Sequence, residues 1–333
     1  MKRMTFFGMP ALLAMLVANP GVSQTNKKLA QTGFEFLSVQ SDGRAAGLAG
    51  AVNSLEMQSS SLFFNPAGMA RMASRIDLSA SDNQWIADIH HNTYSLAVNP
   101  RRGLYGVLGF SIQSIDYGDR FYGTIVDDSE KGYIDTGDLS PSATAFGVGY
   151  AKALTDRFSV GGQVRWVTQD LGSFVLPQPD STTAKESYDM TVMAYDFGTL
   201  FRTGFKSLVF GMSVRNFSKE VKYIEDGFQL PLVFTLGISM DLMDLFGETG
   251  IRQSLILSAD ATHYRSHPEQ VMVGLDYKLL DVLSLRAGYV DGNDEDGLSF
   301  GIGVTRYGFA LDYAYTPYGI FDKVQRVTAR FSY

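Results

Sequence analysis

Residues 158–168 read FSVGGQVRWVT, and this stretch sets the pattern on which the fold of the chain depends. Apolar residues and one glycine occupy one set of alternate positions, and small or polar residues with Arg165 occupy the other set. A period of two places these two sets on opposite faces of a β-strand. The stretch therefore predicts a strand with one apolar face and one polar face that carries a charge in mid-strand.

The same alternation recurs over most of the chain after residue 75. Fourteen segments show it, at residues 75–81, 92–98, 104–117, 142–153, 158–171, 189–202, 208–217, 231–241, 254–264, 270–279, 283–290, 298–306, 308–315 and 323–333. An even number of crossings is what a closed antiparallel barrel in the bacterial outer membrane requires. The first two segments are the weakest of the series.

Three features favour a membrane barrel over a soluble sandwich, which shows the same alternation. The segments are long enough for a tilted membrane crossing, and Tyr and Phe recur near their ends, where an aromatic girdle would lie. The polar faces also carry charges of both signs, as expected for a polar lumen. These charges are Arg165, Asp196, Arg215, Asp260, Asp276, Arg286, Asp312 and Arg330.

The connections between segments alternate in length. The longest ones, at residues 118–141 and 172–188, follow odd-numbered segments, whereas short ones such as 154–157 and 280–282 follow even-numbered segments. This asymmetry is typical of barrels with long outer loops and short periplasmic turns. Residues 242–253 are an exception, because they form a long connection on the short side.

The N-terminus has the pattern of an export signal. Lys2 and Arg3 precede an apolar run at residues 6–17, and the small residues at 21–23 predict cleavage before Gln24. The apolar run is too short for a retained transmembrane helix. We therefore expect three regions: a signal peptide at 1–23, a lumen segment at 24–74, and the barrel at 75–333.

The lumen segment is expected to pack inside the barrel because residues 41–71 are rich in Gly and Ala and fit neither a surface helix nor a two-faced strand. Asn65 before Pro66 predicts a helical turn over residues 66–72, with Asn65 as its N-cap. A buried charge needs a partner, and Arg44 is a candidate partner for a lumen carboxylate.

The chain ends on an amphipathic segment in which Phe331 and Tyr333 share a face. A terminal aromatic of this kind is what the outer-membrane assembly machinery recognises in many barrels. We therefore expect Phe331 and Tyr333 to act as an assembly signal.

Composition excludes several functions. The formal net charge is -7, which argues against nucleic acid as a partner, and the absence of Cys removes disulfides and thiolate metal sites. The four histidines (His90, His91, His263 and His267) have no suitably spaced ligand partners, and the acidic loop at residues 291–297 fails the calcium-loop template. No serine is marked as a nucleophile. We expect no cofactor, no metal and no enzymatic activity.

Two stretches carry a family resemblance: SDGRAAGLAGA at residues 41–51 and LFFNPAGMA at residues 62–70. They resemble the N-terminal signature of the PorV/PorQ family, outer-membrane proteins related to the FadL fatty-acid transporter barrels. QSIDYG at residues 113–118 is also similar to the family, whereas LEMQ at 55–58 departs from it. The signature residues are Arg44, Ala45, Ala46, Gly47, Gly50, Asn65, Pro66, Ala67 and Gly68.

The resemblance implies a barrel of about fourteen strands whose N-terminal segment occupies the lumen. It also implies location in the outer membrane, among its lipids. PorV-like and PorQ-like members serve the type IX secretion system, in which PorV-like proteins bind the C-terminal signal domain of cargo. FadL relatives instead pass hydrophobic molecules through a plugged barrel.

The resemblance thus leaves two function hypotheses and a weaker third. The leading one is a non-enzymatic secretion component whose outer loops bind cargo or other secretion proteins. The alternative is a FadL-like channel for hydrophobic small molecules. An open ion pore comes third, because the lumen segment is expected to block it.

Overall fold

The structure is a computed structural model in which residues 32–118, 121–126, 130–177, 183–222, 227–246, 252–292, 297–319 and 323–333 are described. The predicted signal peptide at 1–23 lies outside these residues, and so does the centre of the acidic loop at 293–296.

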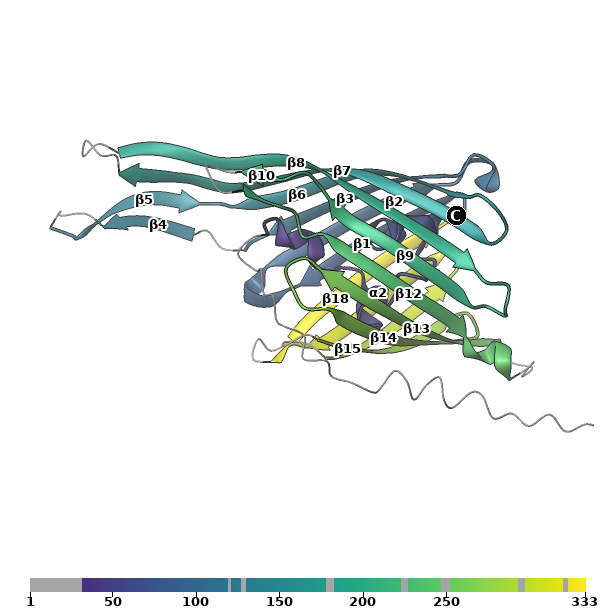
Figure 1. Cartoon of the computed structure of the whole chain (residues 1–333). Helices are drawn as coiled ribbons and strands as arrows, with labels where there is room; N and C mark the ends of the chain where they lie inside the picture. The colour runs from purple at the N-terminus through teal and green to yellow at the C-terminus, as the bar shows by residue number, and fades with distance from the viewer. Residues whose placement is uncertain are drawn as a thin grey trace, which may run out of the picture.

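Fourteen antiparallel strands form a closed barrel, in the order β1-β18-β17-β16-β15-β14-β13-β12-β9-β8-β7-β6-β3-β2 (Figure 1). Their bounds are β1 Ile76–Gln84, β2 His90–Val98, β3 Val107–Asp116, β6 Ser142–Ala153, β7 Phe158–Pro177, β8 Thr183–Arg202, β9 Val209–Phe217, β12 Val233–Asp241, β13 Gln253–Tyr264, β14 Gln270–Leu279, β15 Leu283–Asp291, β16 Leu298–Arg306, β17 Phe309–Pro317 and β18 Lys323–Ser332. The first and last strands pair along their length, with Ala80 opposite Ala329. The predicted all-β closed barrel is confirmed.

The longest connections are partly β-structure, where the sequence analysis treated them as loops. β4 (Phe121–Val126) pairs with β5 (Tyr133–Leu139), and β10 (Val221–Lys222) pairs with β11 (Gly227–Phe228). β7 and β8 also continue past a register shift between Asp170 and Ser173. Figure 1 shows β7 and β8 projecting from the barrel as a long arm with β4 and β5 beside it. The residue types in these connections, such as FYGTIV, suit strands because they are aromatic and β-branched.

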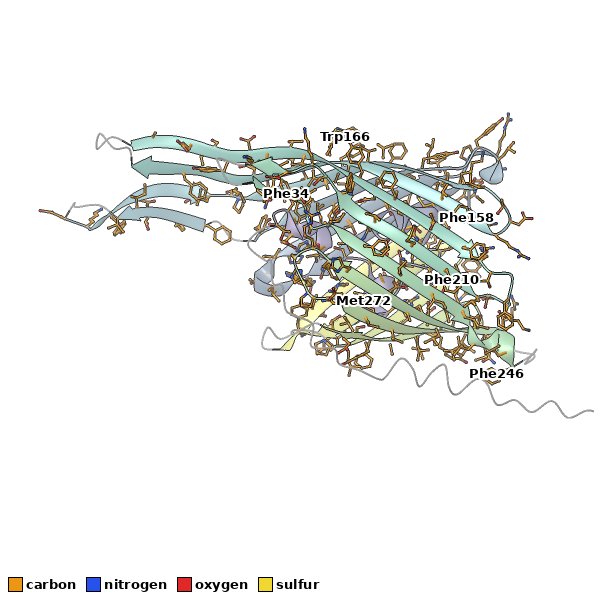
Figure 2. The ribbon with its side chains drawn as sticks, viewed as in Figure 1. Phe34, Phe158, Trp166, Phe210, Phe246 and Met272 are labelled. Atoms are coloured by element: carbon orange, nitrogen blue, oxygen red, sulfur yellow. The ribbon has the colours of Figure 1, made fainter. Side chains whose placement is uncertain are left out.

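Outward-facing side chains of the barrel strands are mostly large and apolar. Trp166 and Phe210 are 43% and 46% exposed and point away from the barrel, as Figure 2 shows. On the same strand as Trp166, the alternate residues Gln163 and Arg165 are buried. An apolar outer belt around a polar interior is the arrangement of a barrel that crosses lipid.

The described residues before β1, from residue 32 onwards, lie mainly inside the barrel (purple in Figure 1). They form the short helices η2 Glu35–Ser38, α2 Gly43–Gly47, η3 Gln58–Phe63 and η4 Pro66–Met69. Three further helical turns lie in connections, at η5 Ile86–Asp88, η6 Pro100–Gly103 and η7 Leu242–Leu245. In the described part of the chain, no helix has the length and apolar character needed to cross a membrane.

The sequence of this inner segment, residues 32–74, explains its short helices. The Asp42 side chain accepts a hydrogen bond from the Ala45 N–H (3.0 Å) and so caps α2 at its N-terminus. Gly50 follows α2 with φ of 83°, a left-handed conformation that favours glycine and turns the chain. Ala45 and Leu48 are completely buried, and Gly43 and Gly47 let this segment approach the barrel wall closely. We call residues 32–74 the plug.

Glycines of the wall receive the plug. A Cβ atom added at Gly161 of β7 would lie 2.5 Å from the Ala67 nitrogen, inside van der Waals contact. The neighbouring Gly162 faces the other way, and a Cβ atom there would meet its nearest atom at 3.4 Å, an ordinary contact. The absence of a side chain at Gly161 therefore lets β7 approach the backbone of η4 closely.

We expect Gly161→Val to destabilise the barrel by about 1–3 kcal/mol, because the added side chain overpacks the plug contact. Gly162→Val is the matched control, since it adds the same side chain to the same strand on the outer face. The free energy of unfolding, from urea titration of the folded barrel in detergent micelles, measures both. Equal losses in the two variants would contradict the close contact.

Candidate functional site

A ladder of buried charges ties the plug to the wall on one side of the lumen. Arg286 of β15 contacts Asp276 of β14 at 3.2 Å and Asp312 of β17 at 2.6 Å. Arg44 of the plug adds a contact to Asp276 at 3.3 Å. The charges alternate in sign, so each buried group is compensated by a neighbour.

Glycines make this ladder possible. β16 lies between β15 and β17, and the Arg286 side chain must cross it to reach Asp312. Gly303 of β16 stands at the crossing, where an added Cβ atom would lie 2.9 Å from Nη1 of Arg286. Gly301 lies on the same face of β16 as Gly303, and an added Cβ atom there would lie 3.4 Å from Cβ of Arg286. Their role in clearing the path of Arg286 follows from the structure.

A second set of contacts holds the start of α2. Nη2 of Arg330 in β18 lies 3.4 Å from an Asp42 oxygen and 3.3 Å from Ser60 Oγ. The backbone N–H of Gly43 donates to Thr328 Oγ1 at 2.7 Å. Asp42 therefore both caps α2 and pairs with the wall.

A third set holds the plug backbone opposite α2. Asp260 of β13 accepts a hydrogen bond from the Asn53 N–H at 2.8 Å, and Arg215 of β9 donates to the Phe63 carbonyl oxygen. Asn65 joins two parts of the plug to β8, because its side-chain amide donates to the carbonyl oxygens of Asn53 (2.8 Å) and Thr199 (3.1 Å). Its Oδ1 accepts from the Ala67 N–H at 3.1 Å and caps η4.

All nine signature residues lie in the lumen. Arg44, Ala45, Ala46 and Gly47 belong to α2, Gly50 ends its turn, Asn65 caps η4, and Pro66, Ala67 and Gly68 lie in η4. Each of them except Arg44 is buried. The structure thus brings the two halves of the signature into contact with opposite parts of the wall.

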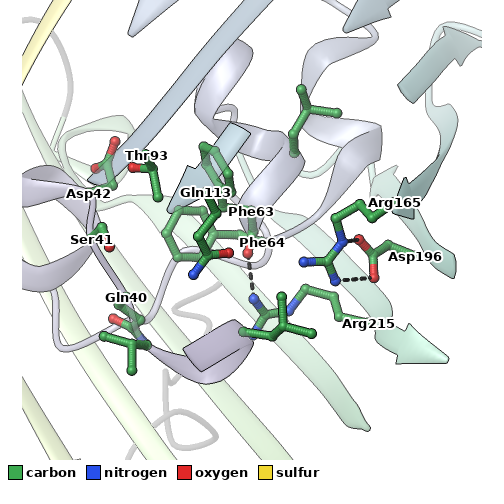
Figure 3. Close-up of a pocket in the computed structure, with 13 residues that line it drawn as sticks. Gln40, Ser41, Asp42, Phe63, Phe64, Thr93, Gln113, Arg165, Asp196 and Arg215 are labelled. Carbon is green, nitrogen blue, oxygen red and sulfur yellow. Dashed lines mark hydrogen bonds and ion pairs between the residues drawn. The ribbon is translucent and has the colours of Figure 1, made fainter. Parts of the chain in front are cut away.

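Arg165 takes part in a cluster that the sequence did not reveal in full. It pairs with Asp196 of β8 at 2.8 Å (Figure 3). The Asn216 N–H donates to the same carboxylate at 2.7 Å. Asn216 has φ of 61° next to a register shift between β8 and β9, and this conformation turns its backbone N–H toward Asp196. No sequence signal marked Asn216, because its role depends on the register shift.

The lumen beside this cluster contains little free space. A cavity of about 20 Å³ lies between the plug and the wall, bordered by Phe64, Arg165 and Arg215 (Figure 3). This volume has room for about one water molecule. The plug therefore fills the lumen at this level.

A larger cavity, which we call the vestibule, lies between the plug and the long connections. Its volume is about 690 Å³, within the range of ligand pockets in proteins. Apolar and aromatic residues make up much of its lining: Phe36, Val39, Trp85, Ile89, Ile115, Tyr117, Met272, Val290, Leu298 and Tyr318. Trp85 packs edge-on against Tyr318 at 5.0 Å between ring centroids, and the Arg326 guanidinium lies 5.7 Å from the Trp85 ring.

Three buried polar atoms of the vestibule residues have no hydrogen-bond partner in the described part of the chain. They are Oγ of Ser38, Nδ1 of His91 and Oγ of Ser299. Buried polar groups normally have partners, so these three atoms are exceptions, and each is covered from solvent in the structure. The vestibule lining thus combines apolar and aromatic side chains with a comparable share of polar ones, among them Glu35, Gln40 and Gln169.

The histidines differ from one another in position. His91 lines the vestibule and is 4% exposed, although nothing in the sequence distinguished it from the other three histidines. His90 pairs with Asp82 at 3.0 Å, His263 pairs with Glu269 at 3.2 Å, and Ser266 contacts His267 at 2.8 Å. Among the described residues, no group of three or more His, Cys, Asp or Glu side chains is placed to hold a metal ion.

The terminal aromatics lie where the barrel closes. Phe331 packs against Phe309 with ring centroids 4.6 Å apart, and the Tyr333 N–H donates to the Ile76 carbonyl oxygen at 2.9 Å. The ladders between β1, β2 and β3 run without a register break, so this part of the wall is continuous.

The sequence profile of the uncharacterised protein family UPF0164 matches residues 9–226. The chain belongs to the UPF0164 family. The resemblance to the PorV/PorQ family rests on the signature residues alone and stays a prediction. No curated protein matches the chain.

Three solved barrels are similar in fold. They are the toluene transporter TbuX of Ralstonia pickettii (TM-score 0.55, 11% identity, 87% of this chain and 97% of that chain), the monoaromatic hydrocarbon channel CymD (0.56, 11%, 89% and 98%) and the toluene transporter TodX of P. putida (0.55, 10%, 87% and 97%). At these identities the similarity establishes the fold, which is that of FadL-type outer-membrane transporters.

We expect Arg286→Met to destabilise the barrel by about 3–5 kcal/mol, because it leaves two buried carboxylates without their shared cation. Arg252→Gln is the control, since Arg252 is exposed and lies 3.7 Å from the exposed Asp281. Urea titration of both variants gives the comparison. A loss in Arg286→Met no larger than in the control would show that the ladder does not hold the plug.

Proposed function

We propose that this chain is an outer-membrane channel that binds hydrophobic small molecules in the vestibule and passes them through the barrel. The vestibule carries the proposal. A cavity of about 690 Å³ has the size of a small-molecule site, and its aromatic and aliphatic side chains, which share the lining with polar ones, suit an apolar ligand. Its position between the long connections and the plug suits capture from outside the cell.

The similar barrels support this choice over the secretion hypothesis that the signature residues favoured. Two of them are described as toluene transporters and one as a monoaromatic hydrocarbon channel. The fold alone does not transfer a substrate, so the lining of the vestibule is the independent argument. The apolar outer belt and the export signal at residues 1–23, with cleavage before Gln24, support an outer-membrane location.

Passage requires movement of the plug, because the lumen beside it holds about one water molecule. Hydrogen bonds and ion pairs to the wall, as at Asn53 and Asp42, hold the plug together with apolar packing. These contacts can break locally while the strand ladders stay paired. A filled lumen also argues against a permanently open ion pore.

Binding can be tested with toluene as the probe and Trp85 as the reporter. The chain has two tryptophans, and Trp166 faces outward, so Trp166→Phe leaves Trp85 in the vestibule as the single indole. In this background, toluene is expected to change the Trp85 fluorescence in a saturable way. A second variant, Val290→Phe, reduces the free volume of the vestibule without adding another indole.

We expect Val290→Phe to weaken toluene binding by about tenfold, which corresponds to about 1.4 kcal/mol of lost binding energy. Val290 lines the vestibule, whereas its neighbour Tyr289 is 49% exposed on the outer face, so Tyr289→Phe is the control. Uptake of labelled toluene into proteoliposomes checks the same variants for transport. Unchanged binding in Val290→Phe would place the ligand elsewhere.

A second candidate function, a role in type IX secretion, is favoured by the arm. β7 and β8 extend beyond the barrel, and nearby β4 exposes Tyr122 (75%) and Val126 (91%). An exposed hairpin with apolar side chains suits contact with a cargo signal domain or another secretion protein. Recognition of Phe331 and Tyr333 by the assembly machinery would be common to both functions.

Deletion of residues 173–187 separates the two candidates. If the chain serves secretion, cargo at the cell surface falls severalfold while toluene binding by the purified barrel is unchanged, because the described residues of the deleted segment (173–177 and 183–187) lie outside the vestibule lining. Surface proteomics measures the cargo. Normal cargo with impaired toluene uptake in a full gene deletion would leave the channel as the function.

A further inference from the structure

The outer wall carries a groove where the barrel closes. It has a volume of about 980 Å³ and runs across the seam between β1 and β18. Ala80 of β1 and Ala329 of β18 form its floor, and Tyr94, Phe110, Leu311 and Phe331 are among the larger side chains that border it. All of these side chains except the two alanines are large and apolar.

The register of the strands explains the groove. In neighbouring strands, Ala80 of β1 lies opposite Tyr94 of β2 on one side and opposite Ala329 of β18 on the other. Ala329 in turn lies opposite Leu311 of β17. Two small residues pair directly at the centre of this outward row, while large residues flank them on both sides. The hollow is therefore built by side-chain size on a continuous wall, with no gap between the strands.

One cation stands at the short-turn end of the groove. Arg306 lines the groove at the end of β16, and its Nη2 donates to the Tyr307 hydroxyl at 3.1 Å. Its guanidinium lies 4.8 Å from the centroid of the Tyr307 ring. Within the described part of the chain, no carboxylate forms an ion pair with Arg306. Arg330 also borders the groove, but its side chain points inward to Asp42.

The surroundings of the groove suit lipid. An apolar hollow on the outer belt faces acyl chains, and Arg306 stands at the rim of short turns, where lipid headgroups lie. The same rim carries further basic residues in described positions, among them Arg71, Arg75, Arg101, Arg157 and Arg252. Basic residues at a membrane surface attract anionic headgroups.

We propose that this groove is a binding site for one anionic phospholipid of the leaflet on the short-turn side. An acyl chain lies over Ala80 and Ala329, and the phosphate accepts hydrogen bonds from Arg306. The Tyr307 ring holds the guanidinium in place for this contact. The proposal rests on membrane insertion of the barrel and is independent of what the vestibule binds.

The test uses the purified full chain and two probes with identical acyl chains, phosphatidylglycerol and phosphatidylcholine. Native mass spectrometry of the detergent-solubilised barrel measures how much of each lipid is retained. The wild-type chain is expected to retain one phosphatidylglycerol in preference to phosphatidylcholine. Arg306→Gln is expected to reduce that preference about fivefold, from the loss of one cation near the headgroup.

Ala80→Leu with Ala329→Leu fills the groove and is expected to lower retention of both lipids about tenfold. Two controls match these changes. Arg101→Gln removes a guanidinium that also contacts a tyrosine, at 5.4 Å from the Tyr105 ring, but lies outside the groove. Ala287→Leu enlarges an outward alanine of β15 outside the groove.

Each outcome decides the proposal. Reduced retention in the groove variants with unchanged retention in both controls supports a specific site. Equal retention of the two lipids by the wild type, or equal losses in the controls, overturns it and leaves ordinary lipid contact with the wall. Electrophoretic mobility of unheated samples shows whether each variant is a folded barrel, so a folding failure is not mistaken for a lost site.

Discussion

The charge ladder centred on Arg286 is the interaction on which the rest of the structure depends. Its guanidinium lies between Asp276 and Asp312, and Arg44 extends the ladder into the plug. Buried charges are costly unless they are paired, so the plug cation Arg44 and the wall carboxylate Asp276 stabilise each other. Without the plug, the lumen would have to fill with water to solvate these groups. The polar lumen therefore depends on the small-residue plug to pair and cover its charges.

The plug also creates the candidate site. Because it fills the lumen at the level of Phe64 and Arg165, the free space above it becomes a closed-ended vestibule rather than a section of a pore. The vestibule is lined partly by plug residues such as Phe36 and Val39 and partly by wall residues such as Val290. A bound molecule would thus contact the element that must move for passage. Coupling between binding and plug movement then has a direct physical route through shared contacts.

The outer face of the barrel also varies in side-chain size from place to place. Most of it is a belt of large apolar side chains, but the pairing of Ala80 with Ala329 hollows it at the closing seam. The ends of β7 and β8 beyond the register shift between Asp170 and Ser173, by contrast, extend past the barrel as the arm (Figure 1). The molecule therefore has three separable surfaces: the vestibule, the outer wall with its groove at the seam, and the arm.

The sequence by itself determined the strand periodicity, and from it the closed barrel, the number of strands and the polar lumen. Those features are local, since a period of two and a mid-strand charge such as Arg165 can be recognised without knowing any neighbour. The Asn65 turn was likewise predictable, because capping depends on adjacent residues. Only the tertiary structure decided which charges pair, that Asn216 joins Asp196, that His91 faces the vestibule, and that two alanines meet at the seam. These relations join residues far apart in the chain, and they depend on the register and closure of the barrel, which no local pattern encodes.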